Sequence, residues 1–124
     1  MTTFDTLVKL AKRLRAPGGC PWDQKQTIES LMKCIEDESE EVSAAIKNKD
    51  HANLKEELGD LLFSMIMVMN IAEEEAHFTH KDVMKAIEEK IISRHTWVFG
   101  EDKAATPEEA LALWKKNKEK EKST

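Results

Sequence analysis

The chain has 124 residues, which is enough for one domain with one core and leaves no room for a second. Its 24 acidic side chains outnumber its 19 lysines and arginines, so the net charge is −5, which argues against a general nucleic-acid-binding surface. The N-terminal segment lacks the apolar core of a signal peptide, and the most apolar run, residues 61–72, is too short to span a bilayer. We therefore expect a cytoplasmic protein with neither a nucleic-acid nor a membrane partner.

Apolar side chains recur every three or four residues through most of the chain, which predicts an all-α bundle of four to five helices. The first helix covers residues 4–14 and follows Thr3, a good N-cap. The segment APGGCPWDQ comes next, and its two prolines and two glycines are the strongest loop signal in the sequence. Trp22 and Asp23 are therefore expected on a loop.

Two longer helices are predicted at residues 27–48 and 53–75, joined by a short turn and with Asn53 as the cap of the second. A fourth helix starts at the cap Thr79 and ends near Arg94. After a loop, the tetrad TPEE at residues 106–109 combines a cap, a proline and a glutamate, and predicts a fifth helix. We expect a single domain over residues 1–118 and a frayed polar tail at residues 119–124.

The second helix carries an acidic residue where an apolar one is expected. Glu38 falls within the stripe defined by Leu31, Ile35 and Val42, and Glu41 lies on the flank of that stripe. A run of acids is ordinarily a solvated helix face. A glutamate directed toward a core, however, is costly unless it is paired, protonated or bound to a cation.

The third helix carries a matching pair, because Glu57 and Asp60 flank its apolar stripe. If the two helices form an antiparallel hairpin, these two acids converge with Glu38 and Glu41 around one cleft. Four carboxylates favour a hard divalent cation, Mg²⁺ first and Mn²⁺ second. Gly59 lies between the two acids, and either close helix packing or room for a ligand would explain it.

Lys90 and Arg94 are four residues apart on the fourth helix, so they can act together on a phosphate or pair with acids on the surface. The third helix is apolar nearly all round over residues 61–72, which a small monomer can hardly bury. We therefore expect dimerisation to complete the core, in a homodimer or a tetramer.

The motifs GGCPWDQKQT, DESEE, EELGD and RHTWVFG occur in this order, and the chain over about residues 5–118 resembles the MazG-type nucleoside triphosphate pyrophosphohydrolases, an all-α superfamily. The resemblance implies that the Mg²⁺ ligands and catalytic acids are Glu38, Glu41, Glu57 and Asp60. Asp37 stands where the family has a first glutamate.

The resemblance also implies the substrate contacts. Lys90 and Arg94 would contact the phosphates, although Thr96 and Trp97 replace the usual Pro-His that follows in the family. Trp114 and Lys118 match a pattern that closes over the nucleotide. Trp22 either helps to seat the base or covers the end of the bundle.

The reaction that the resemblance implies is hydrolysis of a nucleoside triphosphate to its monophosphate and pyrophosphate. A broad base range, used to clear unwanted nucleotides from the pool, is the first hypothesis. A narrow substrate such as dUTP, dCTP or phosphoribosyl-ATP is the second. A helical interaction module without turnover is the third, but four intact acids count against it.

Overall fold

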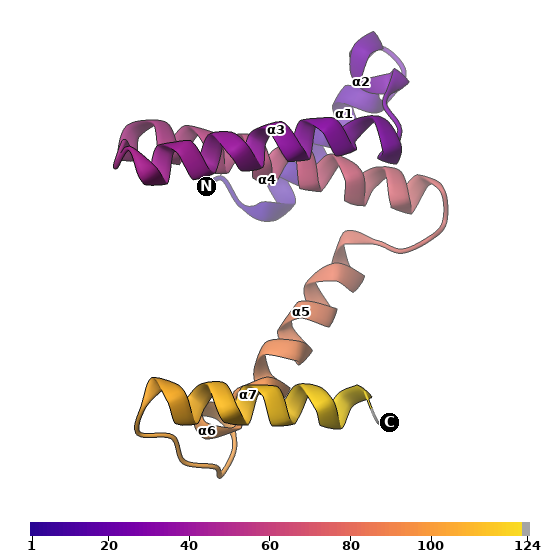
Figure 1. The fold of residues 1–124 in the computed structure, drawn as a ribbon. Coiled ribbons are helices and arrows are strands. Elements are labelled where there is room, and N and C mark those ends of the chain that lie inside the picture. The colour runs from indigo at the N-terminus through magenta and orange to yellow at the C-terminus, as the bar shows by residue number, and fades with distance from the viewer. Residues whose placement is uncertain (123–124) are drawn as a thin grey trace. The chain divides into compact units, whose positions relative to one another are not determined.

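The computed structural model describes residues 1–122, and within them every regular element is a helix, as predicted (Figure 1). The chain divides into two compact units, the first from Met1 to His80 and the second beginning at Lys81. The single domain over residues 1–118 stays a prediction. The helices in chain order are α1 (Phe4–Arg15), α2 (Pro21–Lys25), α3 (Ile28–Lys47), α4 (His51–Glu74), α5 (His80–Arg94), α6 (Thr96–Phe99) and α7 (Pro107–Lys122).

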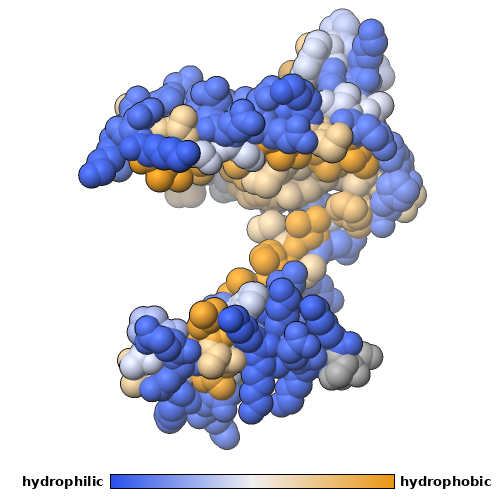
Figure 2. Space-filling model, viewed as in Figure 1, coloured by the Kyte–Doolittle hydropathy of each residue, from blue (hydrophilic) through white to orange (hydrophobic). Residues whose placement is uncertain are grey.

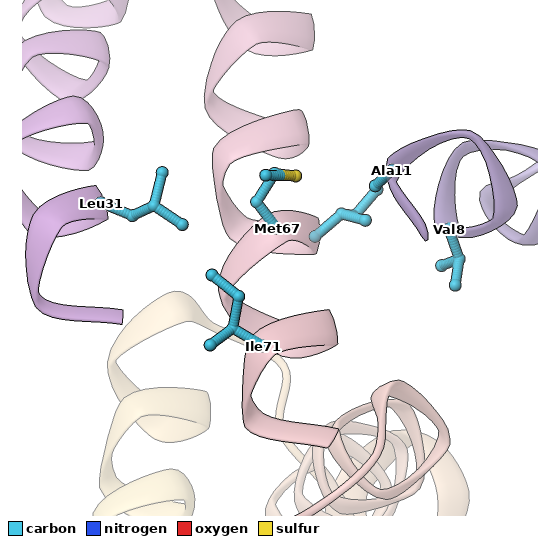
Figure 3. Close-up of a cluster of buried hydrophobic side chains, with 6 residues drawn as sticks. Val8, Ala11, Leu31, Met67 and Ile71 are labelled. Carbon is cyan, nitrogen blue, oxygen red and sulfur yellow. The ribbon is translucent and has the colours of Figure 1, made fainter. Parts of the chain in front are cut away.

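The first unit is built on a hairpin of α3 and α4, which lie side by side, as expected from the short turn between them (Figure 1). Helix α1 packs on α4, and its backbone carbonyl at Val8 accepts a hydrogen bond of 3.2 Å from the buried side chain of Asn70. The buried apolar core lies where these three helices meet (Figure 3), and it consists of Val8, Ala11, Leu31, Ile66, Met67 and Ile71.

Threonines cap three of the helices, and one predicted cap is wrong. Thr3 and Thr27 each form a capping box with the residue three positions later. The Thr106 hydroxyl accepts the N–H of Glu109, as the TPEE tetrad predicts. The cap of α4 is Asp50, not Asn53, because the Asp50 carboxylate accepts the Asn53 N–H at 3.2 Å and satisfies a free donor of the first turn.

Two predicted loops contain short helices. Residues 21–25 form α2, so Trp22 and Asp23 are helical, because Pro21 supplies the fixed φ of a first helical position. The tight turn before it needs glycine, since a Cβ on Gly19 would lie 2.3 Å from the carbonyl oxygen of Leu14. Residues 96–99 form α6 inside the second predicted loop.

The second unit contains α6, α7 and most of α5, and α6 packs on α7. Helix α7 continues to Lys122, so residues 119–122 of the predicted polar tail are helical in the structure, and Glu121 bonds to the end of α5. The fraying of this tail stays a prediction. Residues 123 and 124 lie outside the described part of the chain.

Apolar side chains are exposed on both units (Figure 2). On α4, Leu58 is 49% exposed. Along α5, Ile87 is 47% exposed and Ile91 is 44% exposed. No helix within residues 1–122 combines the length and apolar character that crossing a membrane requires.

Candidate active site

Three of the four predicted metal ligands come together between α3 and α4. One carboxylate oxygen from each of Glu38, Glu57 and Asp60 lies within 4.8 Å of the others. Glu38 and Glu57 are half-buried, and Asp60 is exposed, so the cluster has one open side. The hairpin creates this group, because the chain reverses between residue 38 and residue 57 and brings the two acidic faces together.

The cluster is electrostatically unfavourable without a cation. A side-chain hydrogen bond with Glu38, followed by partial burial and by the negative charges of Glu38, Asp60 and Glu41, raises the pKa of Glu57 to about 7. The Oε2 atom of Glu38 is buried and has no hydrogen-bond partner among residues 1–122. A buried carboxylate oxygen without a donor is costly, so this atom is suited to a ligand that brings positive charge.

The fourth predicted ligand, Glu41, is exposed and lies outside the group of three. Its charge still contributes to the raised pKa of Glu57, so it faces the same region. Asp37, at the position that departs from the family pattern, instead forms an ion pair of 2.7 Å with Lys33 on the exposed side of α3. The structure therefore gives Asp37 a surface pairing.

Gly59 has no neighbour that requires its small size. A Cβ built on it would meet no atom within 4 Å, and the residue is exposed. Close packing between α3 and α4 thus does not explain this glycine. The open space beside Glu57 and Asp60 agrees with the other explanation, room for something that binds there.

Predicted substrate residues also meet in the second unit. The guanidinium of Arg94 and the ammonium of Lys118 each lie 5.2 Å from the centre of the Trp114 ring, which is cation–π distance. Lys90, one turn before Arg94 on α5, is exposed. The spacing of four residues puts Lys90 and Arg94 on one face of α5, and it puts Trp114 and Lys118 on one face of α7.

Sequence reasoning missed two residues that hold Arg94. The Glu121 carboxylate accepts hydrogen bonds from Arg94 Nε at 3.1 Å and from Ser93 Oγ. The buried Asn117 amide donates to the carbonyl oxygen of Arg94 at 3.1 Å and to Thr96 Oγ1 at 3.0 Å. Asn117 lies three residues after Trp114 and Glu121 lies seven residues after it, so both fall on the same face of α7. This spacing is a signal in the sequence that could have found them.

Trp22 is 57% exposed on α2, so its ring does not cover the end of the bundle in this structure. The segment that carries it is fastened by Arg15, whose side chain donates to the carbonyl oxygens of Asp23 and Gln26 and pairs with Glu74 at 2.7 Å. This leaves the indole of Trp22 available for contact.

The donor set at Glu38, Glu57 and Asp60 fits a hard divalent cation. All three ligands are carboxylates, one oxygen is buried without a donor, and the mutual repulsion that raises the pKa of Glu57 would be relieved by a positive charge. No histidine or cysteine belongs to this group, so its chemistry does not resemble that of a zinc site.

Comparisons with known proteins show the family of this chain. Residues 26–99 match the family described as the MazG nucleotide pyrophosphohydrolase domain. The chain is 38% identical over 124 residues to the Escherichia coli nucleoside triphosphate pyrophosphohydrolase, and 40% identical over 119 residues to the Thermotoga maritima nucleoside triphosphate pyrophosphohydrolase/pyrophosphatase MazG. These alignments cover 99% and 96% of this chain, and 47% and 45% of those relatives.

A solved structure shows the same fold. The crystal structure of a mazG-related protein from Thermotoga maritima superposes with a TM-score of 0.78 and 35% sequence identity, and the match covers 93% of this chain and 98% of that one. An uncharacterized protein of Bacillus subtilis is 40% identical over 121 residues, which are 25% of its length. The chain thus spans less than half the length of the curated relatives described here.

Proposed function

The chain belongs to the MazG nucleotide pyrophosphohydrolase family, and on that premise we propose that it hydrolyses nucleoside triphosphates between the α and β phosphates. The products are the nucleoside monophosphate and pyrophosphate. The observation that carries the proposal is the convergence of Glu38, Glu57 and Asp60, with one buried oxygen that lacks a donor.

These three residues would hold Mg²⁺, or Mn²⁺ in its place, through one carboxylate oxygen each. When bound, the cation supplies charge neutralisation for the polyphosphate and makes water a better nucleophile at neutral pH. Glu41 is exposed and lies outside the group of three ligands, which leaves its carboxylate free of that group. We propose that it accepts a proton from the attacking water.

The cations of the second unit suit the negative charge of a phosphate chain. Arg94 offers a planar guanidinium that can form two parallel hydrogen bonds with a phosphate, and Lys90 adds a second charge one turn away. Lys118 and the ring of Trp114 lie beside this guanidinium and form part of the same nucleotide-binding surface.

We further propose a broad base range and a role in clearing unwanted nucleotides from the pool. The exposed ring of Trp22 supports this, because an aromatic face stacks on any base and does not read its hydrogen-bonding edge. A narrow substrate such as dUTP, dCTP or phosphoribosyl-ATP is the competing hypothesis.

Phosphorus NMR tests the reaction directly. The protein is incubated with Mg²⁺ and each common ribo- and deoxynucleoside triphosphate in turn. Monophosphate plus pyrophosphate from many bases is the expected result, and a single productive nucleotide would favour the narrow hypothesis. Diphosphate plus orthophosphate would show that a different bond breaks, and no turnover with any candidate would favour an interaction module.

A matched pair of variants ties turnover to the cluster. Glu38→Gln should abolish turnover and weaken Mn²⁺ binding, measured by electron paramagnetic resonance. Glu40→Gln makes the same charge change two residues away on the exposed side of α3, and it should leave both unchanged. Equal loss in both variants would indicate a general charge effect and contradict the metal assignment.

We also propose that the functional particle is a homodimer or a tetramer. The exposed apolar side chains of α4 and α5, among them Leu58 and Ile87, support this proposal, because an apolar surface of this kind marks a protein interface. Sedimentation equilibrium at micromolar concentration should give at least twice 14.2 kDa. Particles of the monomer mass alone would overturn it.

A further inference from the structure

The end of α7 contacts the end of α5 through one continuous face. Four residues share this face of α7 at helical spacing: Trp114, Asn117, Lys118 and Glu121. Asn117 and Glu121 form hydrogen bonds with Arg94 in the last turn of α5, and Arg94 and Lys118 both lie near the ring of Trp114. Glu121 is the last of the four, in the segment that the sequence predicts to fray.

The Glu121 carboxylate binds one edge of the Arg94 guanidinium. Its Oε2 atom accepts from Arg94 Nε at 3.1 Å and lies 3.0 Å from Arg94 Nη2. Its other oxygen accepts from the Ser93 hydroxyl, which fixes the carboxylate against the helix. The Arg94 side chain is only 14% exposed, so this ion pair is more shielded than an ordinary surface pair.

The contacts with Glu121 leave the guanidinium of Arg94 able to bind an anion. A guanidinium carries five N–H donors in a rigid fork, and the contacts to Glu121 use two of them on one edge. The planar group is then held in orientation on one side by the carboxylate and on another by the Trp114 ring at 5.2 Å. Three donors remain for an oxyanion, so Glu121 does not occupy the whole phosphate-binding edge.

The carboxylate is charged at neutral pH. Hydrogen bonds from Ser93 and Arg94, and then the positive charges of Arg94 and Lys90, lower the pKa of Glu121 below its usual value. Lys90 is the other predicted phosphate-binding cation, so both cations act on the same carboxylate.

We propose that Glu121 is a positioning residue, which holds the Arg94 guanidinium in the orientation that binds the phosphate chain of the substrate. This inference rests on the proposed function, since it assigns a role to a neighbour of a substrate-binding cation. Its effect is on substrate affinity, because Glu121 acts through Arg94 and does not touch the reacting atoms.

Steady-state kinetics of three variants test the proposal, with ATP and Mg²⁺ as the probe. Glu121→Ala should raise KM about tenfold with kcat nearly unchanged. This is less than the roughly hundredfold loss of rate that a misplaced substrate-positioning group can cause. Glu121→Gln keeps an acceptor for Arg94 and should recover part of the affinity. Glu119→Gln changes the same charge two residues earlier on the exposed side of α7 and should match the wild type.

Ser93→Ala is a second route to the same result, because it removes one anchor of the Glu121 carboxylate without touching Arg94. It should raise KM in the same direction by a smaller factor. This variant keeps the proposal testable if Glu121→Ala loses α7, which circular dichroism would reveal.

The outcomes separate this inference from the reaction itself. A wild-type KM in Glu121→Ala, or a loss of kcat alone, would overturn the positioning role while leaving the reaction in place. A lower KM would show that Glu121 competes with phosphate, which also contradicts the proposal. Absence of turnover in the wild type would overturn the proposed function and this inference together.

Discussion

The carboxylates of Glu38 and Glu57 approach each other across the α3–α4 hairpin, with ligand oxygens within 4.8 Å, and a hydrogen bond between them raises the pKa of Glu57 to about 7. Glu57 therefore keeps its proton at moderately acidic pH, because a negative charge on it would be repelled by the negative charge of Glu38. Holding the two carboxylates together therefore lowers the stability of the folded protein, which is common where acidic side chains form a cation-binding site.

The stability of the metal-free protein should fall as the pH rises from about 4.5 to about 7. Over this window the folded chain still holds a proton on Glu57, whose pKa is about 7, whereas the unfolded chain has lost it at the ordinary value of 4.5. Urea denaturation in EDTA at pH 5 and pH 7.5 measures this difference. Glu57→Gln should reduce the pH dependence, and an equal dependence in that variant would contradict the assignment.

Glu41→Gln should remove turnover while leaving the fold and most of the metal affinity intact. Glu41 lies outside the group of three ligands, so its loss should lower kcat by roughly a hundredfold or more, the scale of a missing general base. Rapid-quench kinetics and a Mn²⁺ titration measure the two effects separately. Wild-type rates would exclude Glu41 from the mechanism.

Gly59→Ala should stabilise an isolated chain by roughly 0.5–1 kcal/mol, because alanine favours a helix interior and the added Cβ meets no atom within 4 Å. Thermal melting of the variant measures this gain. If pyrophosphohydrolase activity or the oligomeric mass falls at the same time, the space beside Gly59 is occupied in the working protein. A destabilised variant would contradict the open environment.

Arg15→Ala should cost more stability than Glu74→Gln. Arg15→Ala removes an ion pair and two hydrogen bonds to the carbonyl oxygens of Asp23 and Gln26, and it should lower the free energy of unfolding by about 1–3 kcal/mol. Glu74→Gln removes only the negative charge of the pair. Urea denaturation at pH 7 compares them. Lys12→Ala, which breaks the more exposed pair with Glu73, is the control and should cost less than about 1 kcal/mol.

The Arg15–Glu74 pair should also weaken in acid. A hydrogen bond from Arg15, together with its positive charge, lowers the pKa of Glu74 despite partial burial. The pair therefore contributes stability above the ordinary value of 4.5, and the contribution is lost as the pH falls through the lowered pKa. The stability difference between the wild type and Glu74→Gln should shrink between pH 5 and pH 3, and a constant difference would contradict it.

The helices were predictable because their starts depend on local chemistry. Thr3, Thr27 and Thr106 cap helices in the structure through contacts that span only three residues, which a sequence pattern can represent. The exception has the same cause, since Asp50 and Asn53 both suit a cap. Asp50 is the cap, three residues before Asn53, and it follows directly on Lys49, whose φ is positive.

The candidate site was less predictable, because it depends on contacts across the fold. Glu38 stood out through its helical phase, and its convergence with Glu57 follows from the hairpin. Helical spacing from Trp114 marks the face of α7 on which Glu121 lies, but it does not show which residue that face contacts. Its contact with Arg94, 27 residues earlier, exists only once α7 packs near the end of α5.

The fastening of the segment around Trp22 has an entropic consequence. Arg15 holds the backbone at Asp23 and Gln26, and Gly19 fits against Leu14 where a side chain would collide, so the short helix is ordered before any ligand arrives. An aromatic ring on such a support has only its own two torsions left to lose on contact. Under the proposed function, a base that stacks on Trp22 would therefore lose less of its binding energy to ordering than it would on a flexible loop.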